Sequence, residues 1–305
     1  MVVLSEAEAV DLGLSSAEEM NEVVVFQALD SLTGLALDFI TEEKMEDAGR
    51  VIQSIREIAD LAVENKMELV AINSILAFGK LANEVSGKGY ESILEKLVKA
   101  IGKLGQEAGS NALEAGSKVA ITTLMEIRAA SKIQKSREET ITFSVMLTEI
   151  GTAAAEQGLK DALLSAISSV GEIGKNTAGE KLETETVSTL ILLEDLGKVA
   201  AKKYYDEALS SAGLSIEEIG KLAFKKQLNG VLPQAQWALK TLNVLAEEQN
   251  LEGSAIVAEL ALENLKNMHV ADTEENIEEN MKKLTDIKEL HTKILSDFTG
   301  RLISD

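Results

Sequence analysis

The sequence predicts an all-α protein whose helices repeat along the chain as an α-α superhelix. The main observation is a recurring motif of four residues. Two apolar residues lie three positions apart, a small residue directly follows the second of them, and another small residue lies three positions after the first small one. The motif is clearest at Leu147, Ile150, Gly151 and Ala154. The chain also has one proline, no cysteine and 3% aromatic residues, a composition that allows helix almost throughout.

Copies of the motif run through most of the chain. Its third position falls at residues 59, 79, 102, 128, 151, 171, 197, 220, 243 and 266, and the copies at 128, 243 and 266 are weaker because a larger residue stands there. The mean spacing, (266 − 59)/9, is 23 residues, which suits one amphipathic helix of about 17 residues and a short turn. One such helix cannot bury its apolar stripe alone, so the units are expected to stack. Glycine inside a helix costs about 1 kcal/mol, and its recurrence at this position predicts close helix packing.

Two units of 23 residues resemble the repeat of the HEAT/armadillo α-solenoids, which has two helices in about 40–47 residues. The resemblance covers about residues 45–270 and implies antiparallel helices stacked in a solenoid. HEAT repeats generally carry a proline in their first helix, whereas Pro233 is the only proline here. We therefore expect a right-handed curved array of about ten repeat helices with its own consensus. An irregular multi-helix bundle is the competing fold.

Three parts are expected along the chain: acidic N-terminal capping helices over residues 1–44, the array over 45–270, and a charged capping helix over 271–305. Ser5 and Glu8 have the spacing of a capping box. The run 12–16 is expected to end this first helix, and a second helix is expected to end near Thr41. Turn residues then separate the units, among them those at 108–111, 212–213 and 250–253.

Apolar residues in the last segment have near-heptad spacing, which predicts self-association. They are Met281, Leu284, Ile287, Leu290 and Ile294.

The acidic balance excludes several classes of function. The net charge is −21 and the first basic residue is Lys44, so we expect neither a secretory signal nor a transit peptide. The apolar run Val23–Ile40 contains Asp30 and Asp38, which makes it a poor membrane span. An acidic protein would also be repelled by anionic membranes. These features predict a soluble cytoplasmic protein that does not bind a membrane.

Few residues offer catalytic or metal chemistry. The two histidines, His269 and His291, lack the spacing of a metal site and are better explained by packing or capping. An acidic cluster over residues 42–47 lacks the pattern of a calcium loop, so a solvated helix face is expected there. We therefore predict a protein that is not an enzyme and has no metal or cofactor.

The aromatic residues mark the candidate binding positions. Tyr204 and Tyr205 follow Lys202, and tyrosines beside lysines can stack on single-stranded nucleic acid. The pI of 4.6 argues against nucleic acid and for a protein or peptide partner, with a basic one favoured by charge. Trp237, the single tryptophan, is expected in the core, with an interface anchor as the alternative.

The predicted function is a non-catalytic interaction scaffold that presents a groove to its partner. Lys202, Tyr204, Tyr205 and Trp237 are the partner-binding candidates. Two alternatives remain open. One is a nucleic-acid-binding or catalytic helical-repeat protein that uses its groove, and the other is a self-assembling structural protein, a possible homo-oligomer.

Overall fold

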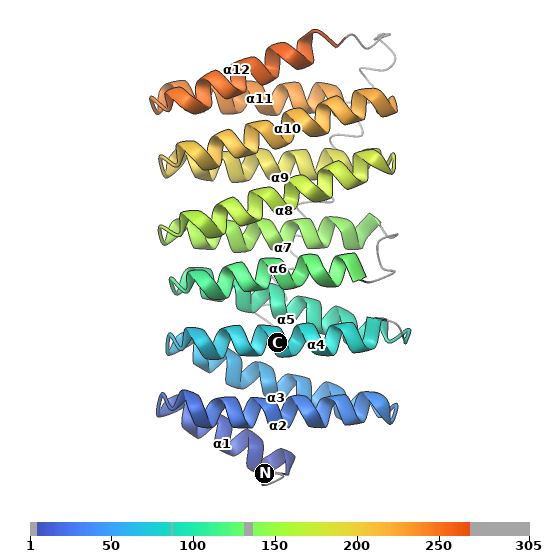
Figure 1. The fold of residues 1–305 in the computed structure, drawn as a ribbon, viewed down its shortest axis with the longest axis vertical. Helices are drawn as coiled ribbons and strands as arrows, with labels where there is room; N and C mark the ends of the chain where they lie inside the picture. The colour runs from blue at the N-terminus through green and yellow to red at the C-terminus, as the bar shows by residue number, and fades with distance from the viewer. Residues whose placement is uncertain (1–4, 87, 131–136, 269–305) are drawn as a thin grey trace. The chain divides into compact units, whose positions relative to one another are not determined.

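The computed structural model describes residues 5–86, 88–130 and 137–268, and it arranges them in twelve α-helices with no strand in these ranges (Figure 1). The predicted all-α helical repeat is confirmed. The chain divides into two compact units, Met1–Gln134 with Glu156–Ala162 (unit 1) and Lys135–Ala155 with Leu163–Asp305 (unit 2).

The first six helices belong to unit 1, and the rest lie almost wholly in unit 2. They are α1 (Glu6–Glu18), α2 (Glu22–Thr41), α3 (Met45–Glu64), α4 (Glu68–Ser86), α5 (Glu91–Ser110), α6 (Glu114–Ala130), α7 (Arg137–Glu156), α8 (Lys160–Gly179), α9 (Glu183–Lys202), α10 (Asp206–Lys226), α11 (Val231–Glu248) and α12 (Glu252–Lys266). From α2 to α10 each helix begins 23 residues after the one before it. The repeat is thus more regular than the motif spacings of 20–26 residues suggest.

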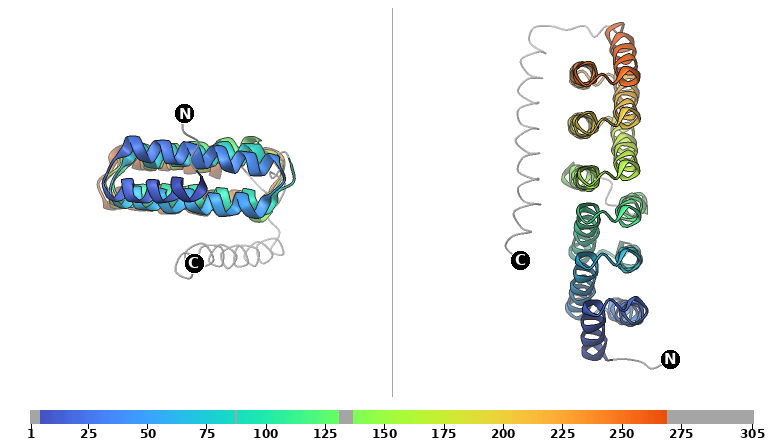
Figure 2. Two further views of the ribbon diagram at one scale, coloured as in Figure 1. Left: turned by 90° about the horizontal axis from the view of Figure 1, so that it is seen from below. Right: turned by 90° about the vertical axis from the view of Figure 1, so that its left-hand side faces the viewer.

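Each unit has two layers of helices (Figure 2). In unit 1 the odd-numbered helices α1, α3 and α5 pack in one layer, and the even-numbered α2, α4 and α6 pack in the other. The same alternation orders α7 to α12 in unit 2. Apolar side chains fill the space between the layers, and Phe78 of α4 and Ile55 of α3 are fully buried there.

Glycines allow close contacts inside each unit, as the motif predicted. A methyl group at Gly220 would lie 2.8 Å from Leu265 Cδ1, and one at Gly197 would lie 2.7 Å from Leu242 Cδ2. Each of these pairs joins a residue to the residue 45 positions later, two helices on in the same layer. A larger residue at either glycine would push the stacked helices apart.

The turns that the structure describes between the helices share one backbone feature. One residue in each takes a positive φ, at residues 20, 43, 66, 89, 112, 158, 181, 204, 227 and 250. In eight of these turns the N–H of the next residue donates to the carbonyl five residues earlier, as Met67 N does to Ala62 O at 2.8 Å. This is the Schellman ending of a helix. The predicted turn at 212–213 was wrong, because α10 runs through it and the chain turns at 203–205 instead.

The N-terminal helices differ from one expectation. Ser5 caps α1 and forms the predicted capping box with Glu8. Residues 12–16 do not end this helix, and α1 continues through them to Glu18. Gly13 lies inside the helix and packs closely against Ile58 of α3. By length and composition α2 could cross a membrane, with a mean hydropathy of 1.6. A core helix meets the same criterion, and α2 packs against α1, α3 and α4.

In both layers, the N-terminus of a helix can be capped by an acidic side chain of the preceding helix in the same layer. Asp206, at the start of α10, accepts a hydrogen bond from Ser254 N of α12 at 2.9 Å. Glu183 of α9 accepts one from Gly230 N at 2.6 Å, and Glu68 of α4 accepts one from Ala115 N at 2.8 Å. Neither α11 nor α12 has a side-chain cap of its own. These carboxylates therefore satisfy N–H groups that the helix itself leaves without partners.

Candidate partner-binding surface

The structure does not bring the four candidate residues together. Lys202 ends α9, Tyr204 and Tyr205 form the turn into α10, and Trp237 lies within α11. The 21 residues of α10 span about 30 Å and separate that turn from the start of α11. The candidates thus form one group at the α9–α10 turn and a second position on α11.

Turn geometry accounts for the placement of both tyrosines. Tyr204 has φ 59° and occupies the left-handed position of the Schellman turn, with 66% of the residue exposed. Tyr205 N donates to Ala200 O at 2.9 Å. Its half-buried side chain takes the place that Leu113 has in an earlier turn. Only Tyr204 offers most of its ring to solvent, which weakens the prediction of a paired stacking platform.

Trp237 is not a core residue, so that expectation was wrong. It is 62% exposed. Smaller residues, including Ala238 and Leu242, already fill the buried face of α11. Trp237 lies on the opposite face with Val244, seven residues later and 44% exposed. Lys240 is exposed between them.

The outer faces of the odd-numbered helices differ between the two units. Positions 46 residues apart occupy the same place in the repeat. In unit 1 this place holds Gln53 in α3 and Lys99 in α5, whereas in unit 2 it holds Val145 in α7, Ile191 in α9 and Trp237 in α11. The outer face thus changes from polar to apolar along the repeat, a signal that can be read from the sequence once the period of 46 is known.

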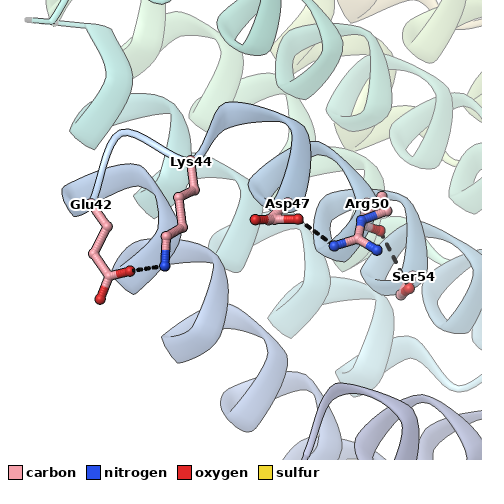
Figure 3. Close-up of polar contacts among 5 residues, drawn as sticks. All are labelled: Glu42, Lys44, Asp47, Arg50 and Ser54. Atoms are coloured by element: carbon pink, nitrogen blue, oxygen red, sulfur yellow. Dashed lines mark hydrogen bonds and ion pairs between the residues drawn. The ribbon is translucent and has the colours of Figure 1, made fainter.

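The acidic cluster at residues 42–47 is partly neutralised by neighbouring cations (Figure 3). Lys44 Nζ lies 2.6 Å from Glu42 Oε2, and Arg50 pairs with Asp47. The hydrogen bond to Glu42 raises the pKa of Lys44. Among the described residues, no three His, Cys, Asp or Glu side chains are placed to hold a metal ion.

A second polar cluster joins α3 to α5, and the sequence motifs did not reveal it. Lys103 Nζ lies 3.6 Å from Asp60 Oδ2 and 3.3 Å from Glu107 Oε1, and Arg56 Nε lies 3.6 Å from the same oxygen of Asp60. Burial raises the pKa of both Asp60 and Glu107, against the opposing effect of Lys103. The spacing of four residues between Arg56 and Asp60, and between Lys103 and Glu107, could have predicted the ion pairs within each helix. The pairing of Lys103 with Asp60, 43 residues away, could not be predicted from local spacing.

Two sets of predicted residues lie outside the described part of the chain. They are the histidines, His269 and His291, and the self-association residues Met281, Leu284, Ile287, Leu290 and Ile294.

Comparisons with known proteins identify the fold class and no family. No protein-family model and no curated protein matches the sequence. One similar solved structure is described as a circular tandem repeat protein with novel repeat topology and enhanced subunit contact surfaces. It is 15% identical, with a TM-score of 0.55 over 94% of this chain and 72% of its own. This similarity supports an all-helical repeat architecture and, at such low identity, nothing about function.

Two further structures match at much lower similarity. One is described as a computationally designed self-assembling cyclic homo-oligomer and the other as the DHF58 filament. They are 15% and 17% identical, with TM-scores of 0.25 and 0.23. They cover 92% and 93% of this chain and 99% of their own, and similarity at this level carries no argument. The more specific resemblance to HEAT and armadillo repeats stays a prediction.

Proposed function

We propose that this protein is a non-catalytic, cytoplasmic scaffold that binds a protein or peptide partner through the outer face of α11. The observation that carries the proposal is the 62% exposure of Trp237. Tryptophan is among the residues that contribute most to binding energy at protein interfaces. Its large apolar ring gains from burial, while its N–H can still donate a hydrogen bond.

The residues around Trp237 extend this face. Val244 adds an exposed apolar side chain, and Pro233 lies four residues before Trp237 on the same side of the helix. The methylene stem of Lys240 can cover apolar surface while its ammonium group stays in water. Together with Trp237, these residues form a face that has an apolar centre and a polar margin, the usual arrangement of a protein interface.

Charge favours a basic partner. The chain has 51 acidic and 30 basic residues, for a net charge of −21. Such a charge accelerates the encounter with a cationic partner and opposes an anionic one. Binding through this face is accordingly expected to weaken as salt is added.

A photo-cross-linking experiment tests the proposal. We would place p-benzoylphenylalanine at position 237 and, in a control variant, at Gln53, which has the same place in the repeat of unit 1. We expect a discrete adduct only from position 237. The identified partner would then be titrated into protein labelled with 5-fluorotryptophan, which gives one ¹⁹F signal because the chain has a single Trp.

The titration has a matched variant. Trp237→Ala is expected to weaken binding at least about tenfold, which corresponds to about 1.4 kcal/mol, while Gln53→Ala leaves it unchanged. Trp237 would be rejected as the anchor if the two variants bound the partner with equal affinity and if the partner caused no shift in the ¹⁹F signal of the labelled parent protein. Adducts that contain only a second copy of this chain would favour the self-assembling alternative.

A further inference from the structure

The turn before α11 contains the only Asn-Gly pair in the sequence, Asn229–Gly230. Asn229 is exposed, whereas Leu228 and Gly230 on either side of it are buried. Val231 N donates to Leu228 O at 3.2 Å and closes the turn around Asn229. The side chain of Asn229 is therefore open to water, while the backbone on both sides of it is held in place.

An asparagine followed by glycine carries the groups for a reaction with itself. The backbone nitrogen of the glycine, once it has lost its proton, attacks Cγ of the asparagine, and glycine has no side chain to hinder the attack. A bond forms between that nitrogen and Cγ, the bond from Cγ to the amide nitrogen breaks, and ammonia leaves with the proton that the backbone gave up. Water then opens the cyclic imide at either carbonyl and leaves aspartate or isoaspartate. Water is the only reactant besides the chain.

In the folded protein a carboxylate holds the nitrogen that would react. Gly230 N donates to Glu183 Oε1 of α9 at 2.6 Å. Hydrogen bonds to a charged acceptor are shorter and stronger than neutral ones. The negative charge of Glu183 also opposes the loss of a proton from the neighbouring nitrogen. To react, Gly230 has to leave Glu183 and turn its nitrogen toward the side chain of Asn229.

We propose that Asn229–Gly230 is a site of spontaneous modification, at which Asn229 becomes isoaspartate or aspartate, and that Glu183 suppresses this reaction while α9 and α11 are stacked. The reaction proceeds from molecules in which the start of α11 has separated from α9. Local openings of this kind cost less free energy than unfolding of the whole chain. The inference does not depend on the proposed partner.

The reaction also weakens the contact that had prevented it. Either product places a negative charge one residue from the nitrogen that Glu183 binds, and like charges repel. Isoaspartate in addition lengthens the backbone by a methylene group and displaces Gly230 N from Glu183. Gly230 itself provides no side-chain cap for α11. The first turn of α11 then loses the carboxylate that satisfies its N–H group, and each opening that leads to reaction leaves a permanent mark.

Peptide mapping tests the proposal, because trypsin releases residues 227–240 as one peptide whose only asparagine is Asn229. We would incubate the full chain at neutral pH, digest it at mildly acidic pH, and follow the fraction of this peptide that has gained the mass of deamidation. Chromatography separates the aspartate and isoaspartate forms. We expect the folded parent chain to react at least about tenfold more slowly than the same chain unfolded in urea. Asn229→Gln, which would need a larger ring to cyclise, confirms the assignment of the signal.

Variants of two capping carboxylates separate the role of Glu183 from general loosening. We expect Glu183→Ala to raise the rate in the folded chain at least about fivefold, and Glu183→Gln, which keeps an acceptor without the charge, to fall between. Asp206→Ala is the matched control, because it removes the corresponding cap of α12 in the same unit. We expect it to leave the rate at Asn229 within about twofold of the parent.

Three results would each overturn the proposal. They are a folded parent chain that reacts as fast as the unfolded one, a Glu183→Ala variant that reacts no faster than the parent, and an Asp206→Ala variant that reacts as fast as Glu183→Ala. Circular dichroism checks that the variants are folded. If Glu183→Ala does not fold, Glu183→Gln decides in its place, and a rate equal to that of the parent would reject the role of Glu183.

Discussion

Gly151 of α7 shows at the scale of one residue how closely the helices pack. A methyl group built on it would lie 2.5 Å from Ala166 Cβ of α8 and 3.3 Å from Leu196 Cδ2 of α9. The first of these atoms is fixed to the backbone and cannot rotate away. The glycine therefore sets the distance between neighbouring helices and is not a helix defect.

We expect Gly151→Ala to lower the free energy of unfolding by about 1–3 kcal/mol, because overpacking outweighs the gain of about 1 kcal/mol in helix propensity. The matched control is Gly34→Ala in α2, where nothing lies within 4 Å of the new methyl group. That change is expected to raise stability by up to about 1 kcal/mol. Urea unfolding measures both, and a Gly151→Ala variant as stable as the parent would contradict the packing argument.

The half-buried carboxyls of Asp60 and Glu107 predict a pH effect on stability. Their pKa values are raised in the folded state, so the folded protein binds these protons more tightly than the unfolded chain. Their stabilising contribution is present in full below the unfolded pKa of about 4 and is lost as pH rises through the raised values.

The Asp60→Asn, Glu107→Gln variant is therefore expected to show a smaller loss of stability than the parent between about pH 4 and pH 7. Urea unfolding at several pH values measures it. Glu57→Gln, at an exposed position of α3, is the control. Parallel pH profiles for the parent and the double variant would show that the cluster has no such role.

At the scale of the helix, the capping of one helix by another links elements that are far apart in sequence. Asp206 Oδ1 accepts from both Ser254 N and Ser254 Oγ, the latter at 2.6 Å. Leu251, the residue before α12, makes no side-chain cap. The start of α12 thus depends on a side chain of α10, and stacking and helix formation are coupled.

Asp206→Ala is expected to lower the free energy of unfolding by about 1–2 kcal/mol and to speed hydrogen exchange in the first turn of α12. Glu252→Ala is the control, because Glu252 has the same place in the repeat at the start of α12 itself. It should lose only the favourable charge at a helix N-terminus, about 0.3–1 kcal/mol. Unchanged exchange in α12 after Asp206→Ala would contradict the capping role.

At the scale of the whole molecule, the two compact units predict separable responses to core damage. Phe78→Ala in α4 removes a fully buried side chain and is expected to cost about 3–5 kcal/mol. Hydrogen exchange should rise across unit 1 and change little in α9 to α12. Leu239→Ala in α11 should give the reverse pattern. Equal loss of protection in both units would show that they unfold as one.

The sequence predicted the helices and their approximate period because apolar spacing and small residues repeat. It did not predict the constant interval of 23 residues between helix starts, which the structure shows from α2 to α10. One reason is that Gly171 and Gly174 of α8 fit the motif equally well, so the motif alone does not fix its position in that helix. Trp237 was misplaced because residue type alone does not tell which face of a helix is covered. The bond from Ser254 to Asp206 joins residues 48 apart, and local patterns carry no record of such pairs.

The constant interval between helix starts has a consequence for how such a chain can change in length. From α2 to α10 the helices start at a fixed interval. Deleting one residue inside a helix would rotate everything after it by about 100° and move its glycines off their contacts. Duplication or loss of a block of 46 residues keeps both layers in phase. Homologues that gained or lost repeats are therefore expected to differ in length by multiples of 46.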